Sequence, residues 1–234
     1  DYTGLLMHMY DEISVDDEEV YKDVVLLRTS HYPCQYIVGS QDFMGYTFKV
    51  SPACLIPRAD TELLCSYLCE NAPGGGRFAD LCTGSGCIAI SASLEAGVHI
   101  DAVEYYDKAY EYLCSNIELN KADVTPIKAD ALDFCGDYDI VVSNPPYIAE
   151  RERGDLSREV LNEPHTALFA DDDGLAFYKK ISQNFRNNEN ITLMFEVGFK
   201  SDSKVANIMS DNGFKNIRTV ADLGGINRIV IGEK

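Results

Sequence analysis

Two consecutive prolines follow an apolar segment near the middle of the chain, in the run Asn144-Pro145-Pro146-Tyr147. Prolines fix the backbone and lack an N–H donor, so the carbonyl groups here remain free to accept hydrogen bonds. The Asn144 side-chain oxygen and the Pro145 carbonyl can each accept one proton of a planar NH₂ group, while Tyr147 packs on its flat face. Such contacts favour a pyramidal nitrogen whose lone pair points at an electrophile. The run therefore predicts chemistry on an amide or an exocyclic amine, with a rigid proline turn as the alternative.

A glycine-containing turn follows an earlier apolar segment, in the run DLCTGSGC at residues 80–87. Glycines let the backbone approach a ligand and turn sharply into a helix. The run lacks the Lys-Ser/Thr pair of a P-loop and the full spacing of a dinucleotide fingerprint, so alone it also fits a plain strand-to-helix turn. Glu104 ends the next apolar segment, about twenty residues on, and can accept hydrogen bonds from both hydroxyls of a ribose. Asp130 ends the third segment and could face an adenine, so the three positions predict one nucleoside-shaped site.

Alternating strands and helices must position these residues. The pattern of apolar residues predicts a β-hairpin between Asp42 and Ile56 and a helix capped by Asp60 or Thr61. A long polar loop is expected after Asn144. Further strands are expected at 78–81, 99–104, 124–129, 138–142, 191–197, 216–221 and 228–231, and further helices at 87–94, 109–120, 175–185 and 203–212. This alternation implies a doubly wound, mostly parallel α/β sheet whose ligands bind at the carboxyl ends of the strands. Residues 1–30 are expected to be helical, like the end of a helical domain.

The composition excludes some classes of partner. Lys and Arg total 20 against 38 Asp and Glu, which gives a formal net charge of −18 and disfavours direct binding to DNA. No apolar stretch reaches the roughly 18 residues of a membrane span and no leader opens the sequence, so we expect a soluble, cytoplasmic protein without a membrane partner. The eight cysteines lack the paired spacing of a zinc site. We expect them to be buried, reduced thiols, and we expect no metal.

Together these motifs resemble the class I S-adenosylmethionine-dependent methyltransferases, and within them the amino-methylating group with an (Asn/Asp)-Pro-Pro-Tyr signature. The segment LIPRADTE at residues 55–62 is similar to the IPRPxTE segment of the PrmC (HemK) family, the release factor glutamine methyltransferases. The similarity extends from about Glu18 to the C-terminus. It includes further segments in the same order, at residues 33–39, 162–164, 173–175, 195–198 and 222–228.

This resemblance implies a seven-stranded Rossmann-like methyltransferase sheet preceded by the hairpin and by the remnant of an N-terminal helical domain. Residues 1–40 would be the end of a helical substrate-recognition domain with its linker, and residues 41–234 the hairpin and the methyltransferase domain. The implied reaction transfers a methyl group from S-adenosyl-L-methionine to the glutamine amide nitrogen in the Gly-Gly-Gln loop of bacterial class I peptide chain release factors. The product is S-adenosyl-L-homocysteine, and no catalytic triad is needed.

The resemblance also assigns residues to roles. The cofactor would be lined by Cys82, Thr83, Gly84, Ser85, Gly86, Glu104, Asp130, Ala131 and Asn144. The glutamine amide would be held by the catalytic run Asn144, Pro145, Pro146 and Tyr147. Arg58 and Thr61, with Glu62, would shape the substrate entrance, or serve only the local conformation. Glu163 would order a loop over the site, or be an ordinary exposed acid.

Three positions depart from the family pattern: Ala59 replaces a usual Pro, Cys82 a common Gly, and Glu104 a usual Asp. A Cβ at Cys82 is tolerable if its φ is negative. The alternative functions are a glutamine methyltransferase of a ribosomal protein, whose usual segment lacks the Thr61-Glu62 pair, and an adenine-N6 methyltransferase of nucleic acid. A catalytically inert S-adenosylmethionine-binding module is the alternative from outside the enzymes.

Overall fold

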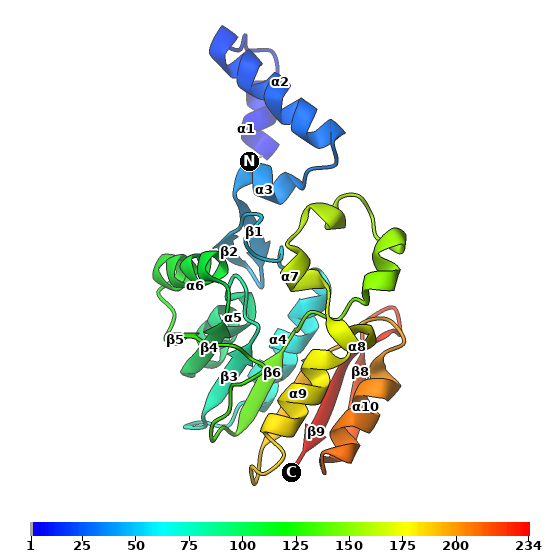
Figure 1. The fold of residues 1–234 in the computed structure, drawn as a ribbon. Coiled ribbons are helices and arrows are strands. Elements are labelled where there is room, and N and C mark those ends of the chain that lie inside the picture. Colours follow the sequence, from blue (N-terminus) through cyan, green and yellow to red (C-terminus); the bar gives the residue numbers. More distant parts are fainter. Residues whose placement is uncertain (1) are drawn as a thin grey trace.

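A seven-stranded sheet with the order β5-β4-β3-β6-β7-β9-β8 forms the centre of the protein (Figure 1). The structure is a computed structural model and describes residues 2–234. Neighbouring strands pair in parallel from β5 to β7, whereas β9 is antiparallel to both β7 and β8. The strands are β3 (Phe78–Leu81), β4 (Ile100–Glu104), β5 (Val124–Lys128), β6 (Ile140–Ser143), β7 (Thr192–Glu196), β8 (Lys215–Ala221) and β9 (Asn227–Glu233). The predicted doubly wound, mostly parallel seven-stranded sheet is confirmed.

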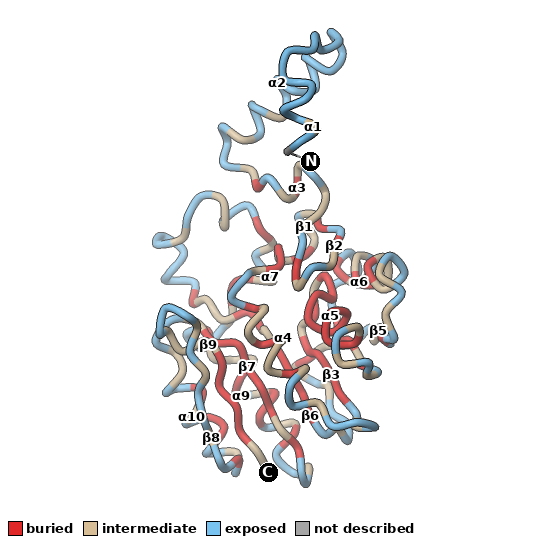
Figure 2. Tube along the Cα trace, turned by 180° about the vertical axis from the view of Figure 1, so that it is seen from behind, coloured by how far each residue is buried: buried red, intermediate tan, exposed pale blue. Residues whose placement is uncertain are grey.

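Helices cover both faces of this sheet because successive strand side chains point to opposite faces. In β3, Phe78 packs in the cluster formed with α4 (Ala59–Asn71) and α5 (Cys87–Ala96), whereas Ala79 and Leu81 pack in the cluster of the other face. That second cluster includes α9 (Ala176–Asn184) and α10 (Asp202–Asp211), and α6 (Asp107–Asn120) packs on β4 and β5. Figure 2 shows the buried strands enclosed between the helical layers.

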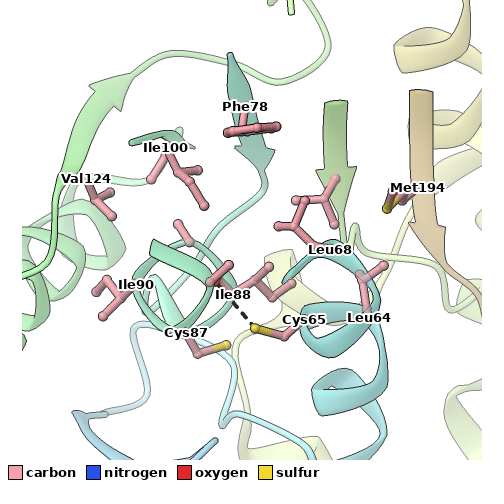
Figure 3. Close-up of a cluster of buried hydrophobic side chains, with 14 of the residues drawn as sticks. Leu64, Cys65, Leu68, Phe78, Cys87, Ile88, Ile90, Ile100, Val124 and Met194 are labelled. Carbon is pink, nitrogen blue, oxygen red and sulfur yellow. Dashed lines mark hydrogen bonds between the residues drawn. The ribbon is translucent and has the colours of Figure 1, made fainter. Parts of the chain in front are cut away.

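The cluster between α4, α5 and the sheet holds the sheet's first face in place. Leu64 and Leu68 of α4 lie beside Ile88 of α5, and the Cys65 thiol donates to the Ile88 carbonyl oxygen at 3.8 Å (Figure 3). Burying each such aliphatic side chain contributes roughly 1.5–3 kcal/mol. This packing fixes the start of α4 over the carboxyl ends of the strands, where its first turn reaches the central loops.

The sheet reverses its strand order between β3 and β6. From β3 the chain first builds outward through β4 and β5, and it then returns to add β6 on the opposite side of β3. Leu81 lies beside Ser143 in the β3–β6 register, and the Ser143 hydroxyl donates to the Leu81 carbonyl oxygen at 2.7 Å. The glycine-containing turn after β3 and Asn144 after β6 therefore meet at the point where α/β sheets bind ligands.

The predicted hairpin is shorter than expected. It consists of β1 (Ser40–Phe43) and β2 (Tyr46–Lys49), and its strand does not continue to Ile56. At the end of β2, the main-chain groups of Lys49 bond to a side chain and not to a further strand. The carboxamide of Asn116 on α6 accepts from the Lys49 N–H at 2.8 Å and donates to the Lys49 carbonyl oxygen at 3.1 Å.

The N-terminal helices α1 (Tyr2–Met7) and α2 (Val15–Thr29) project away from the sheet, and the short α3 (Cys34–Val38) joins them to the hairpin (Figure 1). The predicted helical character of residues 1–30 is confirmed over these spans, and residue 1 lies outside the described residues. The Ser14 hydroxyl caps α2 by accepting from the Asp17 N–H at 3.1 Å. Helix α2 contains no buried residue in the described part of the chain. Arg28 at its end pairs with Glu159 at 3.1 Å.

The segment after Asn144 is not the loop that was expected. It contains η1 (Glu150–Asp155), η2 (Val160–Asn162), α7 (His165–Leu168) and α8 (Asp171–Gly174). These turns are too short to show an apolar period in the sequence. The cap prediction for α4 is also wrong, because Arg58 precedes the helix and neither Asp60 nor Thr61 occupies the cap position.

The cysteines are less buried than predicted. Cys54, Cys65 and Cys87 are buried, but Cys34 and Cys135 are exposed because they lie at the start of α3 and in the loop before β6. No disulfide joins any of them within the described residues. Across residues 2–234, no helix combines the length and the apolar character that crossing a membrane requires.

Candidate functional site

A cavity opens where β3, β4, β5 and β6 end. Residues after each of these strands line it, among them Tyr106 after β4, together with Thr166 and Phe177. Of the residues predicted to hold a nucleoside cofactor, those that line the cavity are Cys82, Thr83, Gly84, Ser85, Glu104, Asp130, Ala131 and Asn144. Gly86 does not line it. Its φ is +84°, and a Cβ there would come within 2.6 Å of Leu113, so Gly86 serves the turn into α5.

Main-chain groups hold Glu104 in this cavity. One carboxylate oxygen accepts from the Gly84 N–H at 2.9 Å and the other from the Tyr106 N–H at 2.8 Å. Burial raises the pKa of Glu104, and these two N–H groups oppose the rise. Each carboxylate oxygen has a second lone pair, so both can still accept from ribose hydroxyls. Glu104 has a longer side chain than the Asp that is usual in the family. Its carboxylate reaches the turn after β3, where the Gly84 N–H binds it.

Cys82 adopts a left-handed conformation, with a φ of +59°. The condition under which a Cβ is tolerated at this position without strain, a negative φ, is therefore not met. The tight turn from β3 towards α5 requires a positive φ here, and this conformation costs a residue with a Cβ roughly 1–2 kcal/mol. Beneath the turn, Asp80 is fully buried and accepts from the Thr83 hydroxyl and, at 3.3 Å, from the Ala89 N–H. Burial raises the pKa of Asp80 to about 7.

A second cavity adjoins the first. Its residues come from the segment before α4, from the turn after β6, from residues 156–168 and from the end of β7. The lining comprises Leu55, Arg58, Asn144, Pro145, Tyr147, Ile148, Leu156, Val160, Ala167, Leu168 and Glu196. Four residues line both cavities, namely Leu55, Arg58, Asn144 and Ala167, whereas Pro146 and Thr61 line the first alone. The two cavities therefore share a boundary of which Asn144 is part.

The Asn144 side chain is held by side chains from two other elements. Its Nδ2 donates to the Thr61 hydroxyl oxygen at 3.1 Å, and Thr61 is buried in the first turn of α4. The Glu196 carboxylate at the end of β7 faces both groups. Burial raises the pKa of Glu196 to about 7, while hydrogen bonds from Thr61 and Asn144 oppose the rise.

Two glycines pack against Tyr147. Gly174 has a φ of +82°, and a Cβ there would lie 2.1 Å from the Tyr147 carbonyl oxygen. A Cβ on Gly198 would lie 3.0 Å from the Tyr147 ring. Burial raises the pKa of Tyr147, so the phenol stays protonated. These close approaches fix both the backbone and the ring of Tyr147 beside the second cavity.

Glu163 joins the segment after β6 to the segment before α4. Its carboxylate pairs with the Arg58 guanidinium and accepts from the Ile56 N–H at 3.1 Å. Glu163 is 6% exposed, so the interpretation as an ordinary exposed acid is wrong. Glu62 lies outside both cavities and accepts from the Met44 N–H at 2.9 Å, which fixes the hairpin turn.

Sequence reasoning missed Glu196, Tyr105 and Tyr106 as lining residues. The two tyrosines directly follow Glu104 and could have been found by that position. Glu196 lies one residue before the end of the strand predicted at 191–197, near the place that Glu104 has in its own strand, and this was an available signal. No three His, Cys, Asp or Glu side chains gather into a possible metal site anywhere in residues 2–234.

Comparisons with known proteins agree with this geometry. The family model described as "Methyltransferase small domain" matches residues 58–177. A release factor glutamine methyltransferase of Streptococcus pneumoniae is 32% identical over 238 residues, which cover 98% of this chain and 85% of that protein. A protein of the same name from Fusobacterium nucleatum is 37% identical over 238 residues, covering 97% of this chain and 67% of that protein.

Solved structures share the fold. A methyltransferase from Pyrococcus furiosus superposes with a TM-score of 0.61 at 18% identity, covering 80% of this chain and 88% of that one. The hMettl16 catalytic domain superposes with a TM-score of 0.66 at 16% identity, covering 87% of this chain and 90% of that one. The sheet and its helices are those of Rossmann-like methyltransferases.

Proposed function

The chain belongs to the release factor glutamine methyltransferases, and from that premise we propose that it methylates the glutamine of the Gly-Gly-Gln loop in bacterial class I peptide chain release factors. The methyl donor is S-adenosyl-L-methionine and its product is S-adenosyl-L-homocysteine. The position of Asn144 carries the proposal, because this residue lines both adjoining cavities. A nucleoside cofactor in the first and a side-chain amide in the second would meet there.

The first cavity suits the cofactor chemically. Glu104 offers carboxylate oxygens to ribose hydroxyls, and Asp130 follows the neighbouring strand on the same rim. Val103, Leu132 and Phe177 supply apolar wall for an adenine. Bound S-adenosylmethionine supplies an electrophilic methyl group on a sulfonium sulfur.

The run from Asn144 to Tyr147 suits the acceptor amide. The Asn144 side-chain oxygen and the Pro145 carbonyl accept the two amide protons, while the Tyr147 ring packs on the amide plane. Pro145 and Pro146 are buried, so they exclude water from these hydrogen bonds. Holding the protons out of plane localises the nitrogen lone pair, which makes the amide a better nucleophile. The nitrogen becomes cationic on attack, and its acidic N–H then gives a proton to water once the methyl group has been transferred.

We further propose that residues 1–40 take part in recognising the protein substrate. Apolar side chains on α1 and α2, among them Leu5 and Leu26, are 67% and 66% exposed, which suits contact with another protein. The release factor would then bind through two regions: its glutamine in the second cavity, and a separate surface in contact with α1 and α2. This function places the protein in the cytoplasm with the release factors.

The test is transfer of labelled methyl from S-adenosylmethionine to a purified bacterial release factor. Three other acceptors are tested in parallel. They are a Gln→Ala variant of the Gly-Gly-Gln loop, the unmethylated form of a ribosomal protein that is normally methylated on glutamine, and an adenine-containing duplex. We expect label on the wild-type factor alone. Label on the ribosomal protein or the duplex instead would overturn the proposal, and so would label that persists on the loop variant.

A further inference from the structure

Glu196 is a buried carboxylate to which the proposed transfer assigns no role. It ends β7, is 4% exposed and lines the second cavity beside Asn144. Among the described residues, its Oε2 atom has no hydrogen-bond partner. A buried acceptor without a partner costs roughly 1–3 kcal/mol, so packing alone does not account for a carboxylate at this position.

The contacts around Glu196 decide how the Asn144 carboxamide is oriented. Asn144 donates one Nδ2 proton to the Thr61 oxygen at 3.1 Å. The Glu196 carboxylate interacts with both Thr61 and Asn144, and an ionised carboxylate can only accept hydrogen bonds. The Thr61 hydroxyl and the Asn144 NH₂ group must therefore both donate towards this part of the site. In the reversed orientation the Asn144 oxygen would face the carboxylate, and two acceptors would repel each other.

We propose that Glu196 is a positioning residue that holds the Asn144 carboxamide with its nitrogen towards Thr61 and its oxygen towards an acceptor NH₂ group. The proposal rests on the proposed function, because an amide acceptor is the reason that an oxygen is required there. Glu196 thus acts through Asn144 and not on the substrate itself. Its ionised form is the active one, since a protonated carboxyl group could donate to the Asn144 oxygen and stabilise the reversed orientation.

Charged groups on α4 and β9 act on Glu196 in opposite directions. Asp60 on α4 raises its pKa, while Arg228 on β9 lowers it. Arg228 is shared between Asp60 at 2.9 Å and Asp222 at 2.8 Å. The phenols of Tyr147 and, on α9, Tyr178 have pKa values raised by burial, so they remain neutral.

The kinetic test compares Glu196→Gln with Glu233→Gln. Glu233 is a matched control, because it lies on the neighbouring strand β9 but pairs in register with Thr192 at the opposite end of β7. We expect Glu196→Gln to lower kcat about 100-fold by misplacing Asn144, with KM for S-adenosylmethionine unchanged. The wild-type rate should rise as the pH passes through about 7, where Glu196 ionises. The Glu196→Gln rate should not. A variant with wild-type kcat, or one that loses cofactor affinity in step with kcat, would overturn the proposal.

Thr61 variants supply an independent arm. Thr61→Ser keeps the hydroxyl and should retain most of kcat, whereas Thr61→Val removes it and should lower kcat. Combined with Glu196→Gln, Thr61→Val should lower kcat by less than the product of the two single effects, because both changes disrupt one hydrogen-bond network. Multiplicative effects would show that Thr61 and Glu196 act separately, which contradicts the proposal.

A spectroscopic test separates this inference from the proposed function. The side-chain ¹⁵N–H₂ resonances of Asn144, assigned by their loss in Asn144→Ala, should shift with pH around 7 in the wild type and not in Glu196→Gln. This measurement needs no acceptor. If the resonances follow Glu196 but no release factor is methylated, the positioning role stands and the proposed function fails. If release factors are methylated while the resonances ignore Glu196, the function stands and the positioning role fails.

Discussion

The two adjoining cavities are built in different ways. In the first, main-chain N–H groups of Gly84 and Tyr106 hold the Glu104 carboxylate. In the second, Asn144 depends on side chains, Thr61 from α4 and Glu196 from β7. Main-chain partners survive substitution of the residues that carry them, whereas side-chain partners do not. The acceptor cavity should therefore be the more sensitive to single substitutions, and the two cavities should fail separately.

Asn144→Ala gives the largest expected effect. It removes the acceptor for the amide proton but leaves Glu104 and the turn after β3 in place. We expect methyl transfer to fall by about 100-fold or more, with cofactor affinity largely kept. Steady-state methylation and calorimetric cofactor binding measure the two quantities. Asn188→Ala is the control, because Asn188 is half-buried, donates to the Gly136 carbonyl and lines neither cavity. Equal loss of rate and affinity would count against separate cavities.

Glu104→Ala should produce the converse failure. Loss of charge-assisted hydrogen bonds worth about 1.5–3 kcal/mol predicts cofactor binding weakened roughly 10- to 100-fold. The rate at saturating cofactor should change little, because Asn144 keeps its own partners. The exposed Glu95, which accepts from the Tyr46 hydroxyl at 2.6 Å, supplies the control variant Glu95→Ala. An unchanged dissociation constant would show that Glu104 does not contact the cofactor.

Glu196→Gln should show how much the ionised Glu196 in the second cavity lowers the free energy of unfolding. Burial raises the pKa of Glu196 from 4.5 to about 7, so the folded protein binds this proton more tightly than the unfolded chain. The wild type therefore loses stability as the pH rises between these values, and a neutral Gln does not. Relative to wild type, the variant should gain roughly 1–3 kcal/mol between about pH 5 and pH 8. Urea unfolding of both proteins at pH 5 and at pH 8 measures this difference in unfolding free energy. A difference that does not change with pH would refute a raised pKa for Glu196.

The first cavity could largely be predicted from the sequence, whereas the contacts that form the second cavity could not. The strand Phe78–Leu81 and the residues that follow it were predictable, because an apolar run followed by glycines has few structural solutions. The turns between Glu150 and Gly174 were not, since each is too short to carry a period. The contacts of Glu196 with Thr61 and Asn144 depend on how α4 packs over β7 and β9. Residues far apart in sequence meet there, and no local pattern encodes their meeting.

Cys82→Gly has the smallest expected effect and tests the main-chain character of the first cavity. Cys82 has a φ of +59°, which costs a residue with a Cβ roughly 1–2 kcal/mol. Glycine removes that cost but adds about 0.5–1 kcal/mol of chain entropy on unfolding and loses the packing of the thiol against the core, so a net change within about 1 kcal/mol of zero is expected. Cys114→Gly, within α6, should instead destabilise by about 1 kcal/mol, as glycine does in helices.

Cofactor affinity should be unchanged in Cys82→Gly, because the N–H groups of the turn, and not the thiol, hold Glu104 in place. Urea unfolding and calorimetric cofactor binding measure the two outcomes. If Cys82→Gly destabilised the protein by clearly more than Cys114→Gly does, relief of strain in the left-handed turn would not be offsetting the lost packing and the added chain entropy. If it weakened cofactor binding, the thiol would itself contact the cofactor. The first cavity would then depend on side chains as the second does, and the difference between the two would disappear.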